Sequence, residues 1–330
     1  MEYAGSINKL LKPKITEKAL VLDLFAGCGG LSLGFEAAGY KTIGFEMNGD
    51  AANTYNENLN GECITAKLDI NYDFPSADII IGGPPCQPFS VGGNQKGVDD
   101  TRNGFPIFIE AVKKIKPKVF LFENVRGLLY SNKWYFEIIL DQLRDLGYIV
   151  DFQLLNAVNY GIPQNRERLF VVGHQSSFNF PKQDKNKVTV GEAIGDLMIT
   201  TPPESKFLNP AQDAYIAKYE KASDCVNPRD LYAHKPARTL TCRNLAGATG
   251  DMQRVKVPDG RRRRVLVREA ARLQSFPDWF NFSGVESSQF YQIGNAVPPL
   301  LAYKVALNLK ECFSKPISNR RYESGKLLFP

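Results

Sequence analysis

The sequence has few of the residues that mark metal sites, disulfide frameworks or membrane spans. Only two histidines, His174 and His234, occur among 330 residues, and the six cysteines show no paired short spacing. We therefore expect no metal site and no structural disulfides, as is typical of a reducing compartment. No apolar run reaches membrane-spanning length, and residues 1–20 lack a signal-peptide pattern. These absences predict a soluble, intracellular protein.

Length and charge indicate two unequal parts. At 330 residues the chain exceeds the usual size of one hydrophobic core, so a large domain and a smaller one are expected. Residues 175–264 carry 16 Lys and Arg against 10 Asp and Glu, whereas the rest is balanced at 25 against 25. The net charge of +6 thus comes from one stretch. Such a stretch is typical of polyanion binding, although a solvated surface gives the same count.

Residues 19–173 alternate short apolar runs with helical segments, which predicts a parallel sheet flanked by helices. The expected strands are nearly continuously apolar, as a sheet covered on both faces requires. They cover residues 19–25, 41–46, 77–82, 118–123, 148–155 and 169–173. The expected helices end at glycines or before a proline and cover residues 31–38, 50–58, 108–115 and 133–146.

The alternation ends after Gly173, where a second domain is expected. Residues 176–240 are rich in Pro, Asn, Lys and Asp, with short amphipathic pieces such as 211–222. The turn at 258–260, between 252–257 and 263–267, predicts a β-hairpin. A last helix is expected at 298–312. No internal repeat occurs.

A glycine-dense turn, DLFAGCGG at residues 23–30, joins the first expected strand to a helix and lets a ligand approach the backbone. Ser32 replaces the third glycine of a dinucleotide fingerprint, which disfavours a nicotinamide site. Glu46 ends the second strand, where a carboxylate can accept both ribose hydroxyls, although an exposed strand-end acid is the alternative. Asp69 lies where a third strand would end and could accept from an adenine amino group. Together these residues suit an adenosine without a diphosphate.

The strand expected at residues 77–82 leads into a loop, GPPCQPFS at residues 83–90, that places Cys86 at the carboxyl edge of the sheet. Three prolines stiffen this loop, whereas a structural cysteine would usually lie inside an apolar element. The loop therefore favours a functional thiol. The following stretch, residues 91–97, is glycine-rich and resembles a mobile lid.

Several motifs, in order, resemble the DNA (cytosine-5) methyltransferase family, which includes the bacterial type II restriction-modification methylases. The resemblance covers nearly the whole chain outside residues 176–235. It is carried by Pro84-Pro85-Cys86-Gln87, Glu123-Asn124-Val125, Gln164-Asn165-Arg166-Glu167-Arg168, residues 268–277 and Gly294-Asn295-Ala296-Val297-Pro298-Pro299.

The resemblance implies an α/β, Rossmann-like S-adenosylmethionine-dependent methyltransferase fold with a smaller, mostly irregular or β target-recognition domain. The catalytic domain would comprise residues 1–177, completed by 285–330, and the target-recognition domain residues 178–284. S-adenosyl-L-methionine would be the cofactor. The expected cofactor-binding residues are Phe25, Gly27, Gly29, Gly30, Leu31, Glu46, Met47, Asp69, Ile70, Pro84, Asn295 and Val297. Two positions depart from the family pattern: Met47, where an aromatic is frequent, and Phe105, where leucine is usual.

Four residues are expected to carry the chemistry. The Cys86 thiolate would add to carbon 6 of cytosine, because cysteine is a good nucleophile near neutral pH. Glu123 would deliver a proton toward N3, which requires burial to keep its carboxyl partly protonated. By resemblance, Arg168 would hold the cytosine O2 and Arg166 would support the Cys86 and Glu123 loops, with an ion pair to Glu167 as the alternative.

Double-stranded DNA is the expected partner, with the target cytosine extruded from the helix. Arginines at the hairpin turn could contact phosphates or be merely solvated, and residues 241–250 resemble a base-reading loop in which Arg243 would read guanine and Asn244 adenine. The expected DNA-binding residues are Gln87, Ser90, Arg243, Asn244, Gly247, Arg261 and Arg262. We further expect a monomer in the bacterial cytoplasm, at the nucleoid when bound to DNA, paired in function with a restriction endonuclease.

Two alternatives remain open. A tRNA cytosine-5 methyltransferase of the same lineage would share the catalytic residues, but it carries a Cys-Phe-Thr signature in the small domain, whereas this chain has only Cys312-Phe313-Ser314 near its end. A DNA-binding regulator without catalysis is disfavoured because Cys86, Glu123 and both arginines are present.

Overall fold

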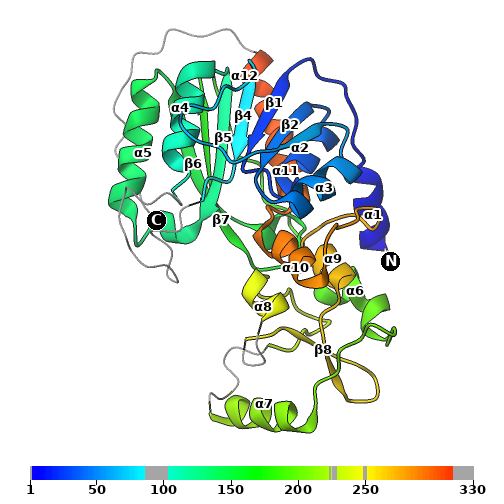
Figure 1. Cartoon of the computed structure of the whole chain (residues 1–330). Helices are drawn as coiled ribbons and strands as arrows, with labels where there is room; N and C mark the ends of the chain where they lie inside the picture. The colour runs from blue at the N-terminus through cyan, green and yellow to red at the C-terminus, as the bar shows by residue number, and fades with distance from the viewer. Residues whose placement is uncertain (1, 86–102, 223, 225–228, 248–250, 315–330) are drawn as a thin grey trace.

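A seven-stranded sheet forms the centre of the larger lobe in a computed structural model, which describes residues 2–85, 103–222, 224, 229–247 and 251–314 (Figure 1). The strand order is β3-β2-β1-β4-β5-β7-β6. The strands are β1 Leu20–Leu24, β2 Lys41–Glu46, β3 Glu62–Thr65, β4 Ile79–Gly82, β5 Val119–Val125, β6 Ile149–Asn156 and β7 Glu167–His174. All six expected strands are confirmed, and β3 was not among them.

The expectation of an all-parallel sheet is wrong at one edge. β7 runs antiparallel to both β5 and β6. The connection from β6 to β7 contains only the short 3-10 turn η3, Ala157–Tyr160, which is too short for the crossover that parallel strands need. The chain therefore doubles back, and β7 inserts between β5 and β6. This reversal brings the end of β5 beside the start of β7.

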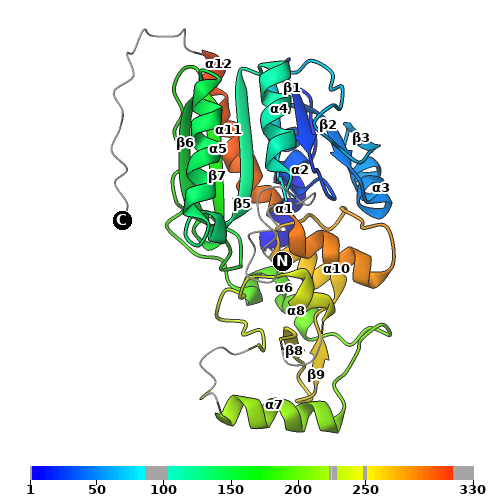
Figure 2. The same cartoon turned by 60° about the vertical axis from the view of Figure 1, so that its left-hand side comes forward.

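Helices cover both faces of the sheet, with α4 and α5 on one side and α2 and α11 on the other (Figure 2). Alternate strand residues serve the two faces: Leu22 and Phe120 pack toward α4 and α5, and Val21 and Leu121 toward α2 and α11. The helices of this lobe are α1 Glu2–Leu10, α2 Gly30–Ala37, α3 Gly49–Asn58, α4 Phe105–Ile115, α5 Lys133–Asp145, α11 Pro299–Leu309 and α12 Glu311–Ser314. The four expected helices before residue 150 are confirmed.

The C-terminal helix α11 completes the larger lobe by packing against α2. A Cβ on Gly34 would collide with the Cβ of Ala302 and the backbone nitrogen of Tyr303, so only glycine permits this close approach. The helix expected at 298–312 is present as α11 followed by α12. Phe105, at the start of α4, is fully buried against Phe122 with ring centroids 5.2 Å apart.

The smaller lobe lies below the carboxyl edge of the sheet (Figure 1). Its hairpin is confirmed as two short antiparallel strands, β8 Arg254–Lys256 and β9 Arg262–Arg264. In the described part of this lobe three helices accompany the hairpin, and the expectation of mostly irregular or β structure did not include them. They are α6 Val190–Met198, α7 Pro210–Ala222 and α8 Cys242–Ala246.

Two further helices, α9 Val267–Leu273 and α10 Glu286–Asn295, lie where the two lobes meet. A third apolar cluster joins Leu33 and Tyr55 of the larger lobe to Ile194, Leu273 and Ile293. This shared core means that the lobes are packed together rather than linked only by chain. The domain boundaries at 177 and 284 stay predictions.

Candidate active site

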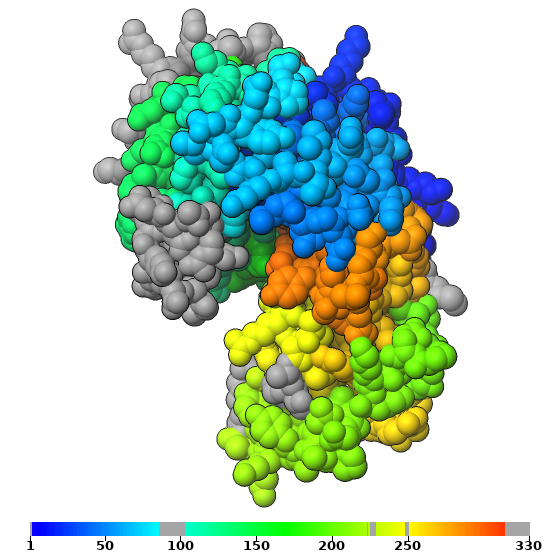
Figure 3. Space-filling model, in the orientation of Figure 1, coloured from blue at the N-terminus to red at the C-terminus, as the bar shows by residue number. Residues whose placement is uncertain are grey.

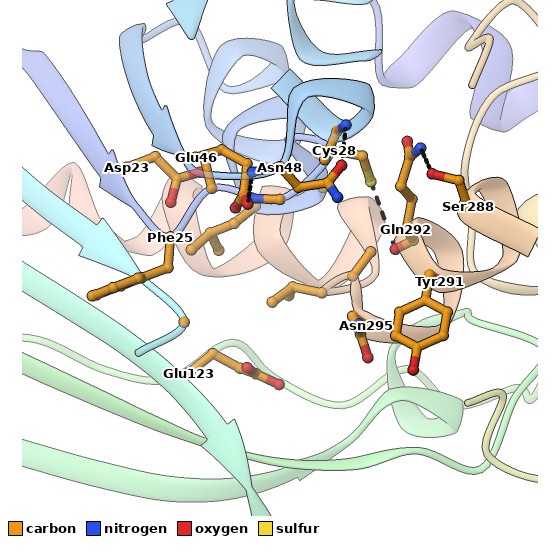
Figure 4. Close-up of a pocket in the computed structure, with 18 of the residues that line it drawn as sticks. Asp23, Phe25, Cys28, Glu46, Asn48, Glu123, Ser288, Tyr291, Gln292 and Asn295 are labelled. Carbon is orange, nitrogen blue, oxygen red and sulfur yellow. Dashed lines mark hydrogen bonds between the residues drawn. The ribbon is translucent and has the colours of Figure 1, made fainter. Parts of the chain in front are cut away.

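A cavity of about 540 Å³ opens at the carboxyl edge of the sheet, which is where ligands bind in such folds. In Figure 4, Glu46 and Asn48 lie on one side of it, Tyr291 and Gln292 of α10 on the other, and Glu123 below, with its carboxylate directed into the enclosed space. Seven of the expected cofactor-binding residues line it: Phe25, Gly27, Gly30, Leu31, Glu46, Asn295 and Val297.

The turn after β1 is shaped by unusual backbone angles. Phe25 has φ of 62°, a left-handed conformation that costs a non-glycine residue energy and is concentrated at functional sites. A Cβ on Gly30 would lie 2.6 Å from the Val297 carbonyl oxygen, so glycine lets the turn approach the segment after α10. The sequence therefore brings residues from both ends of the chain to one cavity wall.

Glu46 is fixed at the cavity by two backbone donors. The amides of Gly27 and Asn48 donate to its two carboxylate oxygens, at 2.9 Å and 2.8 Å. These bonds orient the carboxylate and leave further acceptor capacity on each oxygen. An oriented carboxylate with free lone pairs can accept from two neighbouring hydroxyls.

Asp23 is a cavity residue that sequence reasoning missed. Its carboxyl is buried and accepts from the Ser32 hydroxyl at 2.6 Å. Burial raises the pKa of Asp23 to about 7, against the opposing effect of the Ser32 hydrogen bond, and nearby Glu46 raises it further. Its position at the start of the glycine-dense turn was the feature of the sequence that could have identified it. Cys28 also lines the cavity, and burial raises the pKa of its thiol to about 12, which makes it a poor nucleophile.

The wall formed by α10 was also missed, apart from Asn295. Ser288 donates to Asp50 at 2.7 Å, and the Gln292 side chain accepts from Thr54 at 2.6 Å. These bonds tie α10 to α3 across the mouth of the cavity. Helical spacing back from Asn295 could have found the four residues of this wall, which are Ser287, Ser288, Tyr291 and Gln292.

Glu123 and Arg168 meet at the edge of the cavity because β7 runs antiparallel to β5, pairing Val125 with Arg168. Arg168 Nε lies 2.8 Å from Glu123 Oε1, although this ion pair lacks hydrogen-bond geometry. Burial raises the pKa of Glu123, and the charges of Arg168 and Arg166 oppose that shift. Glu123 is therefore a buried carboxyl beside a guanidinium: burial favours its protonated form, and the two arginine charges favour its ionised form.

Arg166 lies behind this pair and is fully buried. It donates to the carbonyl oxygens of Leu240 at 2.7 Å, Ala296 at 2.9 Å and Gly294 at 3.1 Å. These contacts join the segment before β7 to the smaller lobe and to the end of α10. Backbone carbonyls take the Nη donors of Arg166, whereas its buried Nε has no hydrogen-bond partner in the described part of the chain. Because Cys86 lies outside the described residues, the expected support of the Cys86 and Glu123 loops stays a prediction.

The loop that should carry the nucleophile is described only at its start. Cys86, Gln87 and Ser90 lie outside the described residues. Before them, Gly83 lines the cavity, and the Asn124 amide donates to the Pro84 carbonyl at 2.9 Å. The loop therefore leaves β4 directly beside Glu123, although the Pro84 side chain does not line the cavity.

Four other expected cofactor residues lie outside the cavity wall: Gly29, Met47, Asp69 and Ile70. Met47 is 68% exposed and Ile70 53% exposed. The expected third strand end at 68–70 is wrong, because β3 ends at Thr65 and Asp69 accepts from the Asn71 amide in an exposed turn. Asp69 would have lain at the carboxyl edge of the sheet only if β3 had continued to that residue.

The expected DNA-binding residues are placed differently from one another. The side chain of Arg243 is 85% exposed on α8, whereas Asn244 is buried and caps that helix. Gly247 follows α8, and its carbonyl accepts from Arg264 at 3.0 Å. Arg261 stacks on Phe207 at 4.0 Å and pairs with Asp259. Arg262 is held by three carboxylates, those of Asp213, Glu220 and Asp230.

Within the described ranges, no group of three or more His, Cys, Asp or Glu side chains could hold a metal ion. None of the helices described is long and apolar enough to cross a membrane.

The fold defines the class of protein as an α/β, Rossmann-like methyltransferase. A mutant of Spodoptera frugiperda DNMT2 matches at a TM-score of 0.69, over 90% of this chain and 100% of that chain, with 19% identity. The Dnmt2 methyltransferase of S. pombe matches at a TM-score of 0.61, over 89% of this chain and 99% of that chain, with 18% identity. At these identities the likeness concerns the fold alone.

The chain belongs to the C-5 cytosine-specific DNA methylases, whose family model matches residues 20–311. Type II methyltransferase M.AplI of Arthrospira platensis is 57% identical over 303 residues, covering 91% of this chain and 88% of that protein. Type II methyltransferase M.FnuDI of Fusobacterium nucleatum is 33% identical over 341 residues, covering 94% and 99%. The family and the enzyme class expected from the sequence are confirmed.

Proposed function

We propose that this enzyme transfers a methyl group from S-adenosyl-L-methionine to carbon 5 of a flipped-out cytosine within a short duplex DNA sequence, through attack of Cys86 on carbon 6. The main support is the pairing of Glu123 with Arg168, 2.8 Å apart, at the edge of the cavity lined by Glu46. A buried acid and a nucleoside-sized pocket are thereby placed within one site. The motif loop bearing Cys86 leaves the sheet at the same edge.

The cavity residues fit an adenosyl cofactor. The oriented carboxylate of Glu46 suits two ribose hydroxyls, Phe25 and Val297 offer apolar surface, and Asn295 offers an amide. The volume of about 540 Å³ falls within the range of small-molecule sites. When bound, S-adenosylmethionine supplies an electrophilic methyl group.

The chain's own residues must activate the cytosine, because carbon 5 is too electron-poor to attack a methyl group unaided. The Cys86 thiolate forms a bond to carbon 6 while the Glu123 carboxyl moves its proton toward N3, which converts the ring to an enamine. Carbon 5 would then bond to the methyl carbon while the bond from that methyl to the cofactor sulfonium broke, leaving the cofactor as a neutral thioether. Transfer of the carbon 5 proton to water and return of the N3 proton to Glu123 would break the bond from carbon 6 to sulfur and regenerate the thiolate. Burial favours the protonated form of Glu123 that the first step needs.

Double-stranded DNA would lie between the two lobes, where the surface is hollowed between α8 and the larger lobe (Figure 3). Extruding a base costs a few kcal/mol, roughly, so contacts elsewhere must offset that cost. The positive excess of residues 175–264 suits contacts to phosphates.

The decisive experiment is covalent trapping with duplex DNA that contains 5-fluorocytosine at the target position. The fluorine cannot leave as a proton does, so the adduct should persist with S-adenosylmethionine present and map to Cys86 by mass spectrometry. Cys86→Ser should bind the same duplex but form no adduct. The proposal fails if the native enzyme methylates DNA without a trapped adduct at this cysteine.

Family membership favours DNA over RNA as substrate, and a comparison of labelled methyl transfer to duplex DNA and to tRNA tests that preference directly. Because its relatives are named type II methyltransferases, we further propose that the enzyme protects host DNA alongside a restriction endonuclease. A monomer acting on chromosomal DNA in the cytoplasm would suffice for that role. Bisulfite sequencing of plasmid from an expressing host would identify the methylated sequence.

A further inference from the structure

Three arginines of the smaller lobe converge on a single carboxylate. Arg229, Arg238 and Arg243 lie 3.9, 3.8 and 4.0 Å from Asp251. Each distance is at the outer limit of an ion pair, and one carboxylate balances only one of three positive charges. Counted as formal charges, the three arginines and Asp251 sum to +2, on the part of the chain that holds the whole positive excess. Arg229 also stacks on the Tyr219 ring at 4.6 Å.

Other arginines of this lobe have close partners. Arg254 lies 2.6 Å from Asp230, and Arg263 lies 2.7 Å from Glu269. Arg264 donates to the carbonyls of Ala246 and Gly247. Arg263 and Arg264 each leave a buried Nε without a hydrogen-bond partner in the described part of the chain, but both donate through their Nη atoms. Arg238 leaves its buried Nη1 without a hydrogen-bond partner there, and its ion pair is the long one of 3.8 Å with Asp251. A buried guanidinium donor without a partner costs free energy that a bound anion would recover.

The segment that carries Arg238 is hydrogen-bonded to the segment that leads into β7. The Asn165 amide donates to the Ala237 carbonyl at 2.8 Å, and the Leu240 amide donates to the Gln164 side chain at 2.8 Å. Arg238 lies between these two attachment points, and the attached loop continues directly into β7. Arg243 belongs to α8, and that helix borders the hollow between the lobes (Figure 3).

We propose that Arg238 and Arg243 bind one backbone phosphate of the DNA, with Arg229 adding positive charge and Asp251 holding the arginines in place before DNA arrives. This inference rests on the proposed DNA substrate. Guanidinium groups suit phosphate because they donate in a planar fork. Arg243 then serves affinity rather than guanine reading. Asp251, facing the incoming phosphate, weakens DNA binding as well as organising the arginines.

The test measures the dissociation constant of the full-length enzyme for duplex DNA between 50 and 200 mM salt. Loss of one phosphate contact should reduce the slope of log affinity against log salt concentration by about 0.9. Between 50 and 200 mM salt, the factor by which the double variant Arg238→Ala/Arg243→Ala loses affinity should therefore be about threefold smaller than the factor for the native enzyme. Arg144→Ala, which removes a charge from an exposed pair with Asp141 on α5, is the matched control and should leave the slope unchanged.

The substitution Asp251→Asn separates phosphate binding from a structural role. With the carboxylate removed, DNA binding at 50 mM salt should tighten several-fold, and the gain should shrink at 200 mM salt. A merely structural cluster would instead be weakened by this substitution, with a lower unfolding temperature and no gain in affinity. An unchanged slope in the double arginine variant, or weaker binding by Asp251→Asn, would overturn the inference. DNA binding requires no reaction at Cys86. The salt dependence therefore tests the phosphate contact, and covalent trapping tests the proposed mechanism separately.

Discussion

Replacing Asp23 with asparagine should remove a pH dependence from the stability of this enzyme. Burial raises the pKa of Asp23 from 3.8 to about 7, so the native state keeps a proton that the unfolded chain loses earlier. The contribution of protonated Asp23 to the free energy of unfolding is fully present below about pH 4 and is lost as the pH rises through 7. A difference of about three pKa units corresponds to about 4 kcal/mol, at 1.36 kcal/mol for each unit. Asparagine stays neutral and can still accept from Ser32.

Urea unfolding of the native enzyme and Asp23→Asn at pH 5 and pH 8.5 would measure this effect. Part of the stabilisation is already lost by pH 5. Between pH 5 and pH 8.5 the free energy of unfolding of Asp23→Asn should therefore rise by about 3 kcal/mol relative to that of the native enzyme. Ser32→Ala is the control, because it removes the hydrogen bond while leaving the buried carboxyl. Parallel pH profiles for native enzyme and Asp23→Asn would refute the reasoning, since they would mean that Asp23 titrates alike in the folded and unfolded chain.

Three further predictions follow from buried contacts. Glu123→Gln should slow single-turnover methyl transfer by about 10²- to 10⁴-fold while DNA binding persists, because the amide cannot deliver a proton; unchanged transfer would exclude Glu123 as the donor. Glu269→Ala should lower the free energy of unfolding by about 3–5 kcal/mol, because it leaves Arg263 buried and unpaired, whereas Arg263→Met combined with Glu269→Leu should restore much of the loss in urea titrations. Gly34→Ala should cost about 1–3 kcal/mol in the same titrations by forcing α2 from Ala302, and no loss would contradict the tight packing.

The strands were predictable because their apolar runs are short, continuous and separated by helices with clear ends. β3 was missed because only Cys63 of its four residues is buried, so it lacks an apolar run. The orientation of β7 was also missed. Local sequence specifies that a segment is a strand, whereas the length of the preceding connection decides whether it can run parallel.

In the candidate site, too, some residues could be predicted from the sequence and others only from the tertiary structure. Glu46 and Glu123 were identified from their positions at strand ends, and both line the cavity. Asp69 was assigned by the same rule and lies in an exposed turn, because its strand ends four residues earlier. Tyr291 and Gln292 could have been found only by helical spacing back from Asn295, since helix residues face the cavity only after α10 has packed against α3.

The sequence by itself determined the family and most strands of the sheet, and it predicted the acid, the arginines and the cysteine, because short motifs specify local backbone and chemistry. Only the tertiary structure decided which charges are paired. Arg262 and Arg243 look alike in the sequence, yet the first is enclosed by carboxylates of α7 and Asp230, while the second is 85% exposed and lies 4.0 Å from Asp251. Pairing depends on contacts between residues far apart in the chain, and such contacts exist only once the two lobes have folded.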